Sequence, residues 1–192
     1  MNLIQIGANS GNDAVNDFIK ENQSLIHLAI LVEPMPFVLN DLNLRYQFID
    51  NVVIESIAIV DNESENTLTL YYEDNSINYE VCSFSKKHLL DHGCPESKIK
   101  SIDVDAMTVN KLMEKYNLTE IDHLFIDTEG LDAHIIASLD FTKYIFKNIT
   151  FEVAHTDGAN TRGSNFSQIT EYLRSLGYTL TIIDHLNMKA SL

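Results

Sequence analysis

The 192-residue chain is poor in cysteine and proline, with two and three residues, and has no tryptophan. Cys82 and Cys94 are too few for a disulfide framework or for a cysteine-based zinc site. No apolar run approaches the length that crosses a bilayer, and the N-terminus lacks the basic and apolar regions of a signal peptide. We therefore expect a cytoplasmic protein without a membrane partner.

Basic residues are also scarce, with 13 Lys and Arg against 28 Asp and Glu, and the formal net charge is -15. Nucleic acids and anionic surfaces are bound through basic patches, so we expect neither as a partner. Because the carboxylates are dispersed along the chain, we interpret the acidity as a solvated surface. The length and the hydrophobic content of 45% predict a single domain over residues 1–192.

Two of the seven glycines fall in one turn near the N-terminus. Residues 1–6 predict an apolar strand, and residues 7–11 (GANSG) predict a tight turn before a helix. A second strand, over residues 25–32, ends in Glu33, which lies 22 residues after Gly11. This combination is typical of the cofactor corner of a Rossmann-like α/β sheet, where the carboxylate holds the hydroxyls of a ribose.

The spacing of the glycines selects among cofactors. Dinucleotide sites use G-x-G-x-x-G, whose middle glycine lets the backbone approach a pyrophosphate. Here Asn9 occupies the middle position, between Gly7 and Gly11. The spacing therefore favours a cofactor without phosphates, such as S-adenosylmethionine, over a nicotinamide dinucleotide.

The remaining elements alternate between strand and helix, which predicts a mostly parallel twisted sheet with helices on both faces. Further strands are expected at 52–60, 99–104, 121–127, 145–153 and 178–183, and helices at 37–44, 86–92, 108–116, 131–139 and 166–176. Residues 67–72 and 77–82 alternate like exposed strands around a turn, which predicts an inserted β-hairpin. Its apolar side chains would either pair with another subunit in a homodimer or cover the core of the same chain.

Polar side chains follow the predicted strands, at the edge where open parallel sheets bind ligands. Asp127 and Glu129 would contact the substrate or the cofactor, or they would cap the helix that follows them. Glu152 and His155 follow a later strand, and His155 would act as a general base or be a solvated loop histidine. Arg162 would bind substrate, or it would be an ordinary surface arginine.

Three blocks in this order together resemble the FkbM-type methyltransferases. They are residues 6–11 (IGANSG), 32–36 (VEPMP) and 126–130 (IDTEG), followed by residues 149–152 (ITFE), and the resemblance runs from residue 3 to about residue 180. Members of this family depend on S-adenosylmethionine and mostly methylate hydroxyls of sugars, polyketides and related small molecules. The resemblance implies a Rossmann-like methyltransferase fold and an O-methyltransferase whose partner is a small hydroxylated acceptor such as a carbohydrate.

The resemblance also implies roles for single residues. The cofactor-binding residues would be Gly7, Ala8, Asn9, Gly11, Glu33, Pro34, Ser56, Ile57 and Asp127. The chemistry of the reaction adds a base, because a hydroxyl nucleophile must lose its proton, and the candidates are His155, Asp127 and Glu152, in that order. From their places in the sequence, Glu129 and Arg162 would contact the substrate. A divalent ion shared by Asp127 and Glu152 is a variant of this mechanism, but the sequence has no compact ligand motif, so we predict no metal ligand.

One position departs from the family pattern. The family often has an acid two residues before the first glycine, and this chain has Gln5 there. An amide accepts a hydrogen bond but supplies no charge to the ammonium group of the cofactor.

Two other functions are compatible with the same corner of the sheet. A nicotinamide-dependent oxidoreductase would use it, although the sequence shows no clear Tyr/Lys or His/Arg catalytic pair. A non-catalytic cofactor-binding module would keep the fold and lose the activity, and Gln5 is its main support. The fold alone does not separate these alternatives, because function lies in the site.

Overall fold

The computed structural model describes residues 1–74, 81–157 and 161–192. Its centre is a seven-stranded sheet in the order β11-β12-β10-β8-β1-β2-β3. These strands are β1 (Asn2–Ile6), β2 (Leu28–Val32), β3 (Val52–Glu55), β8 (His123–Ile126), β10 (Asn148–Glu152), β11 (Thr179–Ile182) and β12 (Asn187–Ser191). β12 is antiparallel to both of its neighbours, and the other pairs are parallel. The strand order reverses between β1 and β8, which is where sheets of this kind bind ligands.

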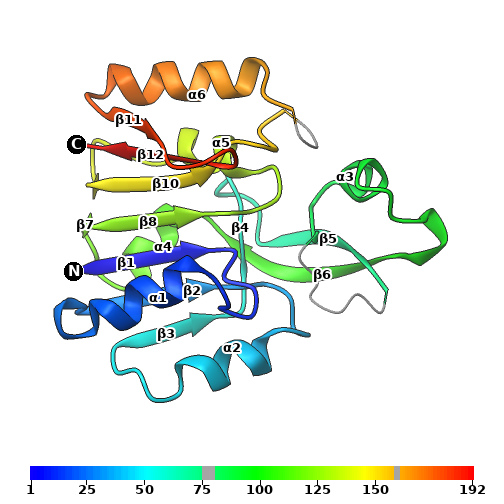
Figure 1. Ribbon diagram of the computed structural model, residues 1–192, viewed down its shortest axis with the longest axis horizontal. Helices are drawn as coiled ribbons and strands as arrows, with labels where there is room; N and C mark the ends of the chain where they lie inside the picture. The colour runs from blue at the N-terminus through cyan, green and yellow to red at the C-terminus, as the bar shows by residue number, and fades with distance from the viewer. Residues whose placement is uncertain (75–80, 158–160) are drawn as a thin grey trace.

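Helices cover both faces of the sheet (Figure 1). They are α1 (Ala14–Glu21), α2 (Leu39–Tyr46), α4 (Val109–Lys115), α5 (Asp132–Ala137) and α6 (Ser164–Ser175). α1 and α2 pack on one face, where Ile19 and Leu42 meet Leu31 of β2. α4, α5 and α6 contribute to a larger cluster on the other face, which contains Ile30 of β2. Because alternate residues of β2 are buried on opposite faces, this strand appears in the sequence as a continuous apolar run.

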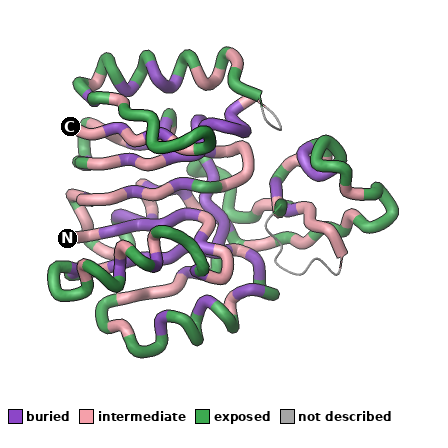
Figure 2. Tube along the Cα trace, in the orientation of Figure 1, coloured by how far each residue is buried: buried purple, intermediate pink, exposed green. Residues whose placement is uncertain are grey.

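Shorter elements complete the main body. β7 (Glu120–Ile121) and β9 (Ile145–Phe146) form a parallel pair. The 3-10 helices η1 (Gln23–Leu25) and η2 (Glu96–Lys98) precede β2 and β6. Figure 2 shows that the buried residues follow the central strands, whereas the helices alternate between buried and exposed positions. None of the helices in the described ranges is long and apolar enough to span a membrane.

The described residues of the segment 58–107, namely 58–74 and 81–107, form a projection that we call the arm. It contains a three-stranded sheet of β4 (Ala58–Ile59), β6 (Ile99–Met107) and β5 (Thr67–Glu73), together with helix α3 (Lys86–Asp91). β5 and β6 are antiparallel along their length. The arm extends from the edge of the main sheet toward which the parallel strands point (Figure 1). It can therefore form a wall of any ligand site at that edge.

Most of the elements expected from the sequence are confirmed, and the differences have local causes. The strand expected at 52–60 splits into β3 and β4, because the chain leaves the main sheet after Glu55 and β4 pairs with β6. The strand expected at 99–104 extends to Met107 and lies in the arm. The sequence analysis missed β12, a short strand in which polar residues alternate with the buried Met188 and Ala190.

The expected insertion is present, but β5 has β6 as its long antiparallel partner. Its other edge carries one antiparallel bridge, between Tyr71 and Ser83. Residues 75–80, which include most of the second strand of the expected hairpin, lie outside the described residues. Leu70 is buried against Met35 and Val38, so β5 covers the interior of its own chain. Pairing with a second subunit stays a prediction.

Candidate functional site

A cavity of about 330 Å³ lies at the carboxyl ends of β1, β2 and β8. The main sheet contributes the turn after β1, Glu33 after β2 and Asp127 after β8. The arm contributes Leu68 and Leu70 from β5. The cavity thus occupies the point at which the strand order reverses, and the arm closes one side of it.

Gly7 makes the turn after β1 possible. Its φ is 81°, and a Cβ atom at this position would stand 1.8 Å from the backbone oxygen of Asp127. The N–H groups of Gly7 and Ala8 both donate to the carbonyl oxygen of Val32 at 3.0 Å. Only glycine lets the turn pass this close to the end of β8.

Glu33 is a buried carboxylate that faces this cavity, with 5% of its surface exposed. One oxygen, Oε2, accepts the N–H of Asn9 at 2.7 Å, and the other, Oε1, accepts the N–H of Met35 at 2.8 Å. Burial raises the pKa of Glu33 to about 6, although both backbone N–H groups oppose the shift. Each oxygen keeps a second acceptor position, so the side chain can hold a pair of hydroxyls.

Gln5 is connected to the cavity through Asp13. The amide Nε2 of the buried Gln5 donates to Asp13 Oδ2 at 2.6 Å. The other oxygen of Asp13 accepts the N–H of Asn16 at 2.9 Å and so caps α1. Asp13 also lines the cavity. A carboxylate from the residue before α1 therefore stands next to Gln5 and at the cavity.

Asp127 begins the turn between β8 and α5 and lines the cavity. Protein surrounds it on most sides while the cavity keeps it open to solvent, and burial raises its pKa to about 7, with repulsion from Asp132 and Glu129 adding to the shift. Asp132 itself is fully enclosed and accepts hydrogen bonds from the Thr128 hydroxyl at 2.6 Å and from the Glu152 N–H at 3.2 Å. Asp132 thus joins this turn to the end of β10.

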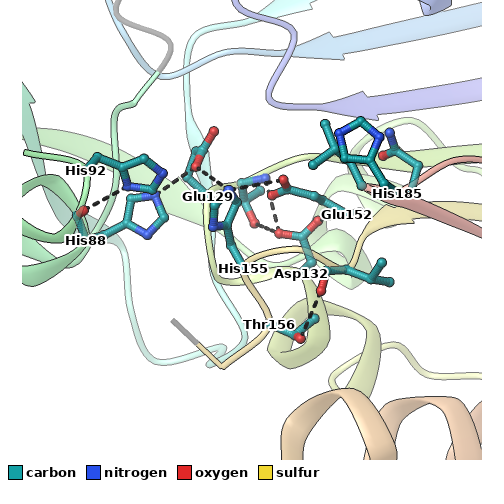
Figure 3. A network of polar contacts seen from close by, with 12 residues as sticks. His88, His92, Glu129, Asp132, Glu152, His155, Thr156 and His185 are labelled. Carbon is teal, nitrogen blue, oxygen red and sulfur yellow. Dashed lines mark hydrogen bonds and ion pairs between the residues drawn. The ribbon is translucent and has the colours of Figure 1, made fainter. Parts of the chain in front are cut away.

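Five polar residues next to the cavity form a cluster that we call the histidine cluster, drawn in Figure 3. They are His88, His92, Glu129, Glu152 and His155. Glu129 Oε2 lies 2.8 Å from His88 Nε2 and 3.8 Å from His155 Nε2, and Glu152 Oε1 lies 3.3 Å from His155 Nε2. Burial lowers the pKa of His155. Burial, followed by repulsion from Asp127, Glu129 and Asp132, raises the pKa of Glu152 to about 9.

The structure brings most of the residues predicted for cofactor binding to the cavity. Those that line it are Gly7, Ala8, Asn9, Glu33, Pro34, Ile57 and Asp127, together with the predicted substrate residue Glu129. The other predicted residues lie apart from this lining. Gly11 is packed behind the turn against Leu42 and Tyr46, Ser56 is exposed, and Arg162 donates to the backbone oxygen of His185. Glu152 and His155 belong to the histidine cluster, on the far side of Glu129.

The sequence analysis missed three groups of residues at this site. Asp13 was detectable as an acid at the start of a predicted helix. His88 and His92 were detectable as two histidines four residues apart on a predicted helix, which places them on one face. Leu68 and Leu70 had no local signal, because only the pairing of β5 with the distant β6 brings them to the cavity.

The family model described as the methyltransferase FkbM domain matches residues 5–180 of this chain. No curated protein sequence matches it.

Three solved structures show the same fold. Methyltransferase FkbM from Methylobacillus flagellatus KT has a TM-score of 0.57 at 12% identity, over 98% of this chain and 43% of that chain. The fibrillarin pre-rRNA processing protein of Methanococcus jannaschii has a TM-score of 0.51 at 13% identity, over 99% of this chain and 65% of that chain. Precorrin-6y C5,15-methyltransferase from Geobacter metallireducens GS-15 has a TM-score of 0.50 at 14% identity, over 100% and 80% of the two chains. The chain thus spans less than half the length of the Methylobacillus protein.

Proposed function

This chain belongs to the FkbM methyltransferase family, a family of S-adenosylmethionine-dependent methyltransferases, and we propose that its cavity binds S-adenosylmethionine for transfer of a methyl group to a hydroxyl of a small molecule. The proposed acceptor is a sugar or a glycan unit. The observation that carries the proposal is Glu33, a buried carboxylate whose two oxygens are oriented by backbone N–H groups at the edge of the cavity.

The proposed division of the cavity follows the chemistry of its lining. Glu33 would accept the two ribose hydroxyls, and the apolar Ile57 and Pro34 would contact the adenine. Gly7 lines the cavity with backbone atoms alone, so the methionine part would lie along the turn after β1. Asp13 would face the ammonium group, in the place of the acid that the family often carries where this chain has Gln5.

The charge of the cavity supports this cofactor over the nicotinamide alternative. Among the described residues that line the cavity, four are acidic, namely Asp13, Glu33, Asp127 and Glu129, and none is Lys or Arg. S-adenosylmethionine carries a sulfonium and an ammonium, whereas a dinucleotide carries a negative pyrophosphate. An acidic cavity attracts the former and repels the latter.

When bound, S-adenosylmethionine supplies a methyl group on a positively charged sulfur. The residues of the chain must then place the acceptor hydroxyl in line with that methyl group. They must also remove the hydroxyl proton as the O–C bond forms and the S–C bond breaks. Positioning of this kind can contribute about 7–11 kcal/mol, and a general base about 10²–10⁴-fold. We propose Asp127 as the proton acceptor ahead of His155 and Glu152, because Asp127 lines the cavity.

The test is a methyl-transfer assay with a panel of sugars and glycans, each compared with the analogue whose hydroxyl is already methylated. S-adenosylhomocysteine and methylated product are measured by mass spectrometry. We expect turnover with at least one acceptor that has a free hydroxyl and none with its methylated analogue. Asp127→Asn should slow this turnover, whereas Asp105→Asn, at an exposed position of β6 outside the cavity lining, should not. Turnover that is equal in the two analogues would contradict the proposal.

We also propose that residues 1–192 act as a single domain. The first and the last strands support this, because β1 and β12 belong to the same seven-stranded sheet.

A further inference from the structure

Three histidines from two distant parts of the chain meet beside Glu129 (Figure 3). His88 lies in α3, His92 is the residue that ends this helix, and His155 follows β10. Their ring centroids are 4.3 Å apart for His88 and His92, 4.9 Å for His88 and His155, and 5.1 Å for His92 and His155. The arm and the main sheet thus each contribute imidazoles to one point.

The donor atoms are close enough to share an ion. One ring nitrogen from each of the three histidines lies within 4.8 Å of the others, and the same holds for one atom each of Glu129, Glu152 and His155. Donors that hold one zinc ion at about 2.0–2.1 Å in tetrahedral geometry are about 3.4 Å apart. Donor atoms that now lie up to 4.8 Å apart would therefore have to approach one another by up to about 1.4 Å, which rotations about side-chain bonds can supply. Glu129 Oε2 already stands between two of the rings, at 2.8 Å from His88 and 3.8 Å from His155.

The tautomer of His92 leaves one ring nitrogen able to bind a metal. Its Nδ1 lies 2.9 Å from the backbone oxygen of His88. A carbonyl oxygen only accepts, so Nδ1 carries the proton and Nε2 of the neutral ring carries the lone pair. Histidines that ligate metals are commonly oriented by such a bond from the other ring nitrogen.

The turn that carries Glu129 is part of the main body and is also hydrogen-bonded to the arm. Its backbone oxygen accepts the hydroxyl of Ser83 at 2.9 Å, and Ser83 is bonded in turn to Tyr71 of β5. The position of the carboxylate is therefore set by the arm as well as by the main sheet.

Among the described residues, no Lys or Arg pairs with the two carboxylates of the histidine cluster. In this part of the chain, the ion-pair partners of Glu129 and Glu152 are histidines. Glu152 is 7% exposed, and its Oε2 is buried without a hydrogen-bond partner among these residues. Buried carboxylate oxygens ordinarily have a partner, and a cation held by Glu129 and His155 would lie next to Glu152, which has one oxygen within 4.8 Å of a donor atom of each.

We propose that His88, His92, His155 and Glu129 bind one divalent transition-metal ion of the zinc type. Imidazole donors favour Zn²⁺, Cu²⁺, Fe²⁺ and Ni²⁺, whereas Mg²⁺ and Ca²⁺ prefer sites made of oxygen atoms alone. His92 is exposed, so the ion can reach the cluster from solvent. The proposal departs from the sequence analysis, which assigned no metal ligand.

Glu129 also lines the cavity, so the ion lies one side chain away from the proposed methyl-transfer site. From this position the ion can bind an oxygen of the acceptor. As a Lewis acid, it would withdraw electron density from the acceptor hydroxyl. This second step rests on the proposed function. Metal binding itself does not.

The experiment is a titration of the chelator-treated full chain with Zn²⁺ and with Mg²⁺, followed by calorimetry. We expect one Zn²⁺ per chain and no comparable binding of Mg²⁺. Co²⁺ serves as a spectroscopic probe, because its visible absorption reports nitrogen ligation. His88→Ala, His92→Ala and His155→Ala should each weaken Zn²⁺ binding by at least about 100-fold, since the loss of even outer-shell partners costs about 10–100-fold.

His27→Ala is the matched control, because His27 is an exposed histidine on the main body and its loss should leave binding unchanged. His92→Ala changes an exposed residue and keeps the test decisive if the buried variants fail to fold. Absence of stoichiometric Zn²⁺ binding would overturn the proposal, as would binding that all three variants retain. The cluster would then be a purely hydrogen-bonded one.

A titration with S-adenosylmethionine in the same metal-free protein separates this inference from the proposed function. Cofactor binding without Zn²⁺ binding rejects the metal site alone. Zn²⁺ binding without cofactor binding rejects the cofactor proposal and leaves the metal site supported.

Discussion

The backbone N–H of Asn9 donates to Glu33 Oε2 over 2.7 Å. This bond joins the turn after β1 to the end of β2, and Asn9 makes it with a positive φ of 45°. The carboxylate is therefore oriented by the turn itself. A ligand that binds Glu33 meets an acceptor whose position has already been fixed, so little conformational entropy is lost on binding.

Glu33→Gln should weaken the binding of S-adenosylmethionine by about 10- to 100-fold. The change removes the negative charge while keeping the shape, and charge-assisted hydrogen bonds contribute about 1.5–3 kcal/mol. Calorimetric titration measures the effect. Glu55→Gln is the control, because Glu55 ends the neighbouring strand but pairs with Lys115 and Tyr116. A decrease of equal size in both variants would show that the Glu33 effect is not specific.

The affinity for the cofactor should fall as the pH falls through about 6. Burial raises the pKa of Glu33 to about 6, and only the ionised carboxylate offers both oxygens as acceptors to the ribose. The contribution of Glu33 should be constant above this pKa, and below it the affinity should decrease by about tenfold per pH unit. Titrations between about pH 5 and pH 8 measure the profile, and Glu33→Gln should flatten it. A variant that keeps the wild-type profile would assign the titration to another group.

Gly7→Ala should destabilise the fold and abolish cofactor binding. The new Cβ would stand 1.8 Å from the backbone oxygen of Asp127, so β1 and β8 would have to separate. Gly93→Ala is the matched control, because Gly93 has nearly the same φ of 82° but a Cβ atom added there would have no neighbour within 4 Å. Urea unfolding should give about 1–2 kcal/mol for Gly93→Ala, which is the backbone cost alone, and a larger loss for Gly7→Ala. Equal losses would mean that the close approach of the two strands is unimportant.

Asp13→Asn should reduce cofactor affinity by about tenfold while leaving stability nearly unchanged. Asn caps a helix about as well as Asp, and its NH2 group can donate to Gln5 Oε1, which has no partner among the described residues, once the Gln5 amide turns over. The variant therefore removes the charge next to Gln5 without removing the cap of α1. Asp41→Asn, in the first turn of α2, changes a similar charge outside the cavity lining. Calorimetry and thermal unfolding of both variants provide the comparison. Unchanged affinity in Asp13→Asn would mean that Asp13 does not compensate for Gln5.

The local features of this site could be predicted from the sequence. The turn at residues 7–11, the acid at Glu33 and the turn at residues 126–130 are defined by neighbouring residues, and each lies where a parallel sheet requires it. The departure at Gln5 was visible, but its relation to Asp13 depends on the direction in which the Gln5 amide points.

Features that depend on long-range pairing could not be predicted in the same way. The alternation in β5 indicates one strand of a local hairpin, yet its full-length partner is β6, more than 25 residues further along the chain. The same pairing positions α3, so nothing in the sequence brings His88 next to His155. The walls of the cavity and the histidine cluster both follow from the placement of the arm.

The most direct test of the account is calorimetric titration of the protein with S-adenosylmethionine and S-adenosylhomocysteine, with reduced nicotinamide dinucleotide as the comparison. The account predicts that the first two bind one per chain in the micromolar range and that the dinucleotide does not bind. Binding of the dinucleotide alone, or binding of none of the three, would contradict the assignment of the acidic cavity to S-adenosylmethionine.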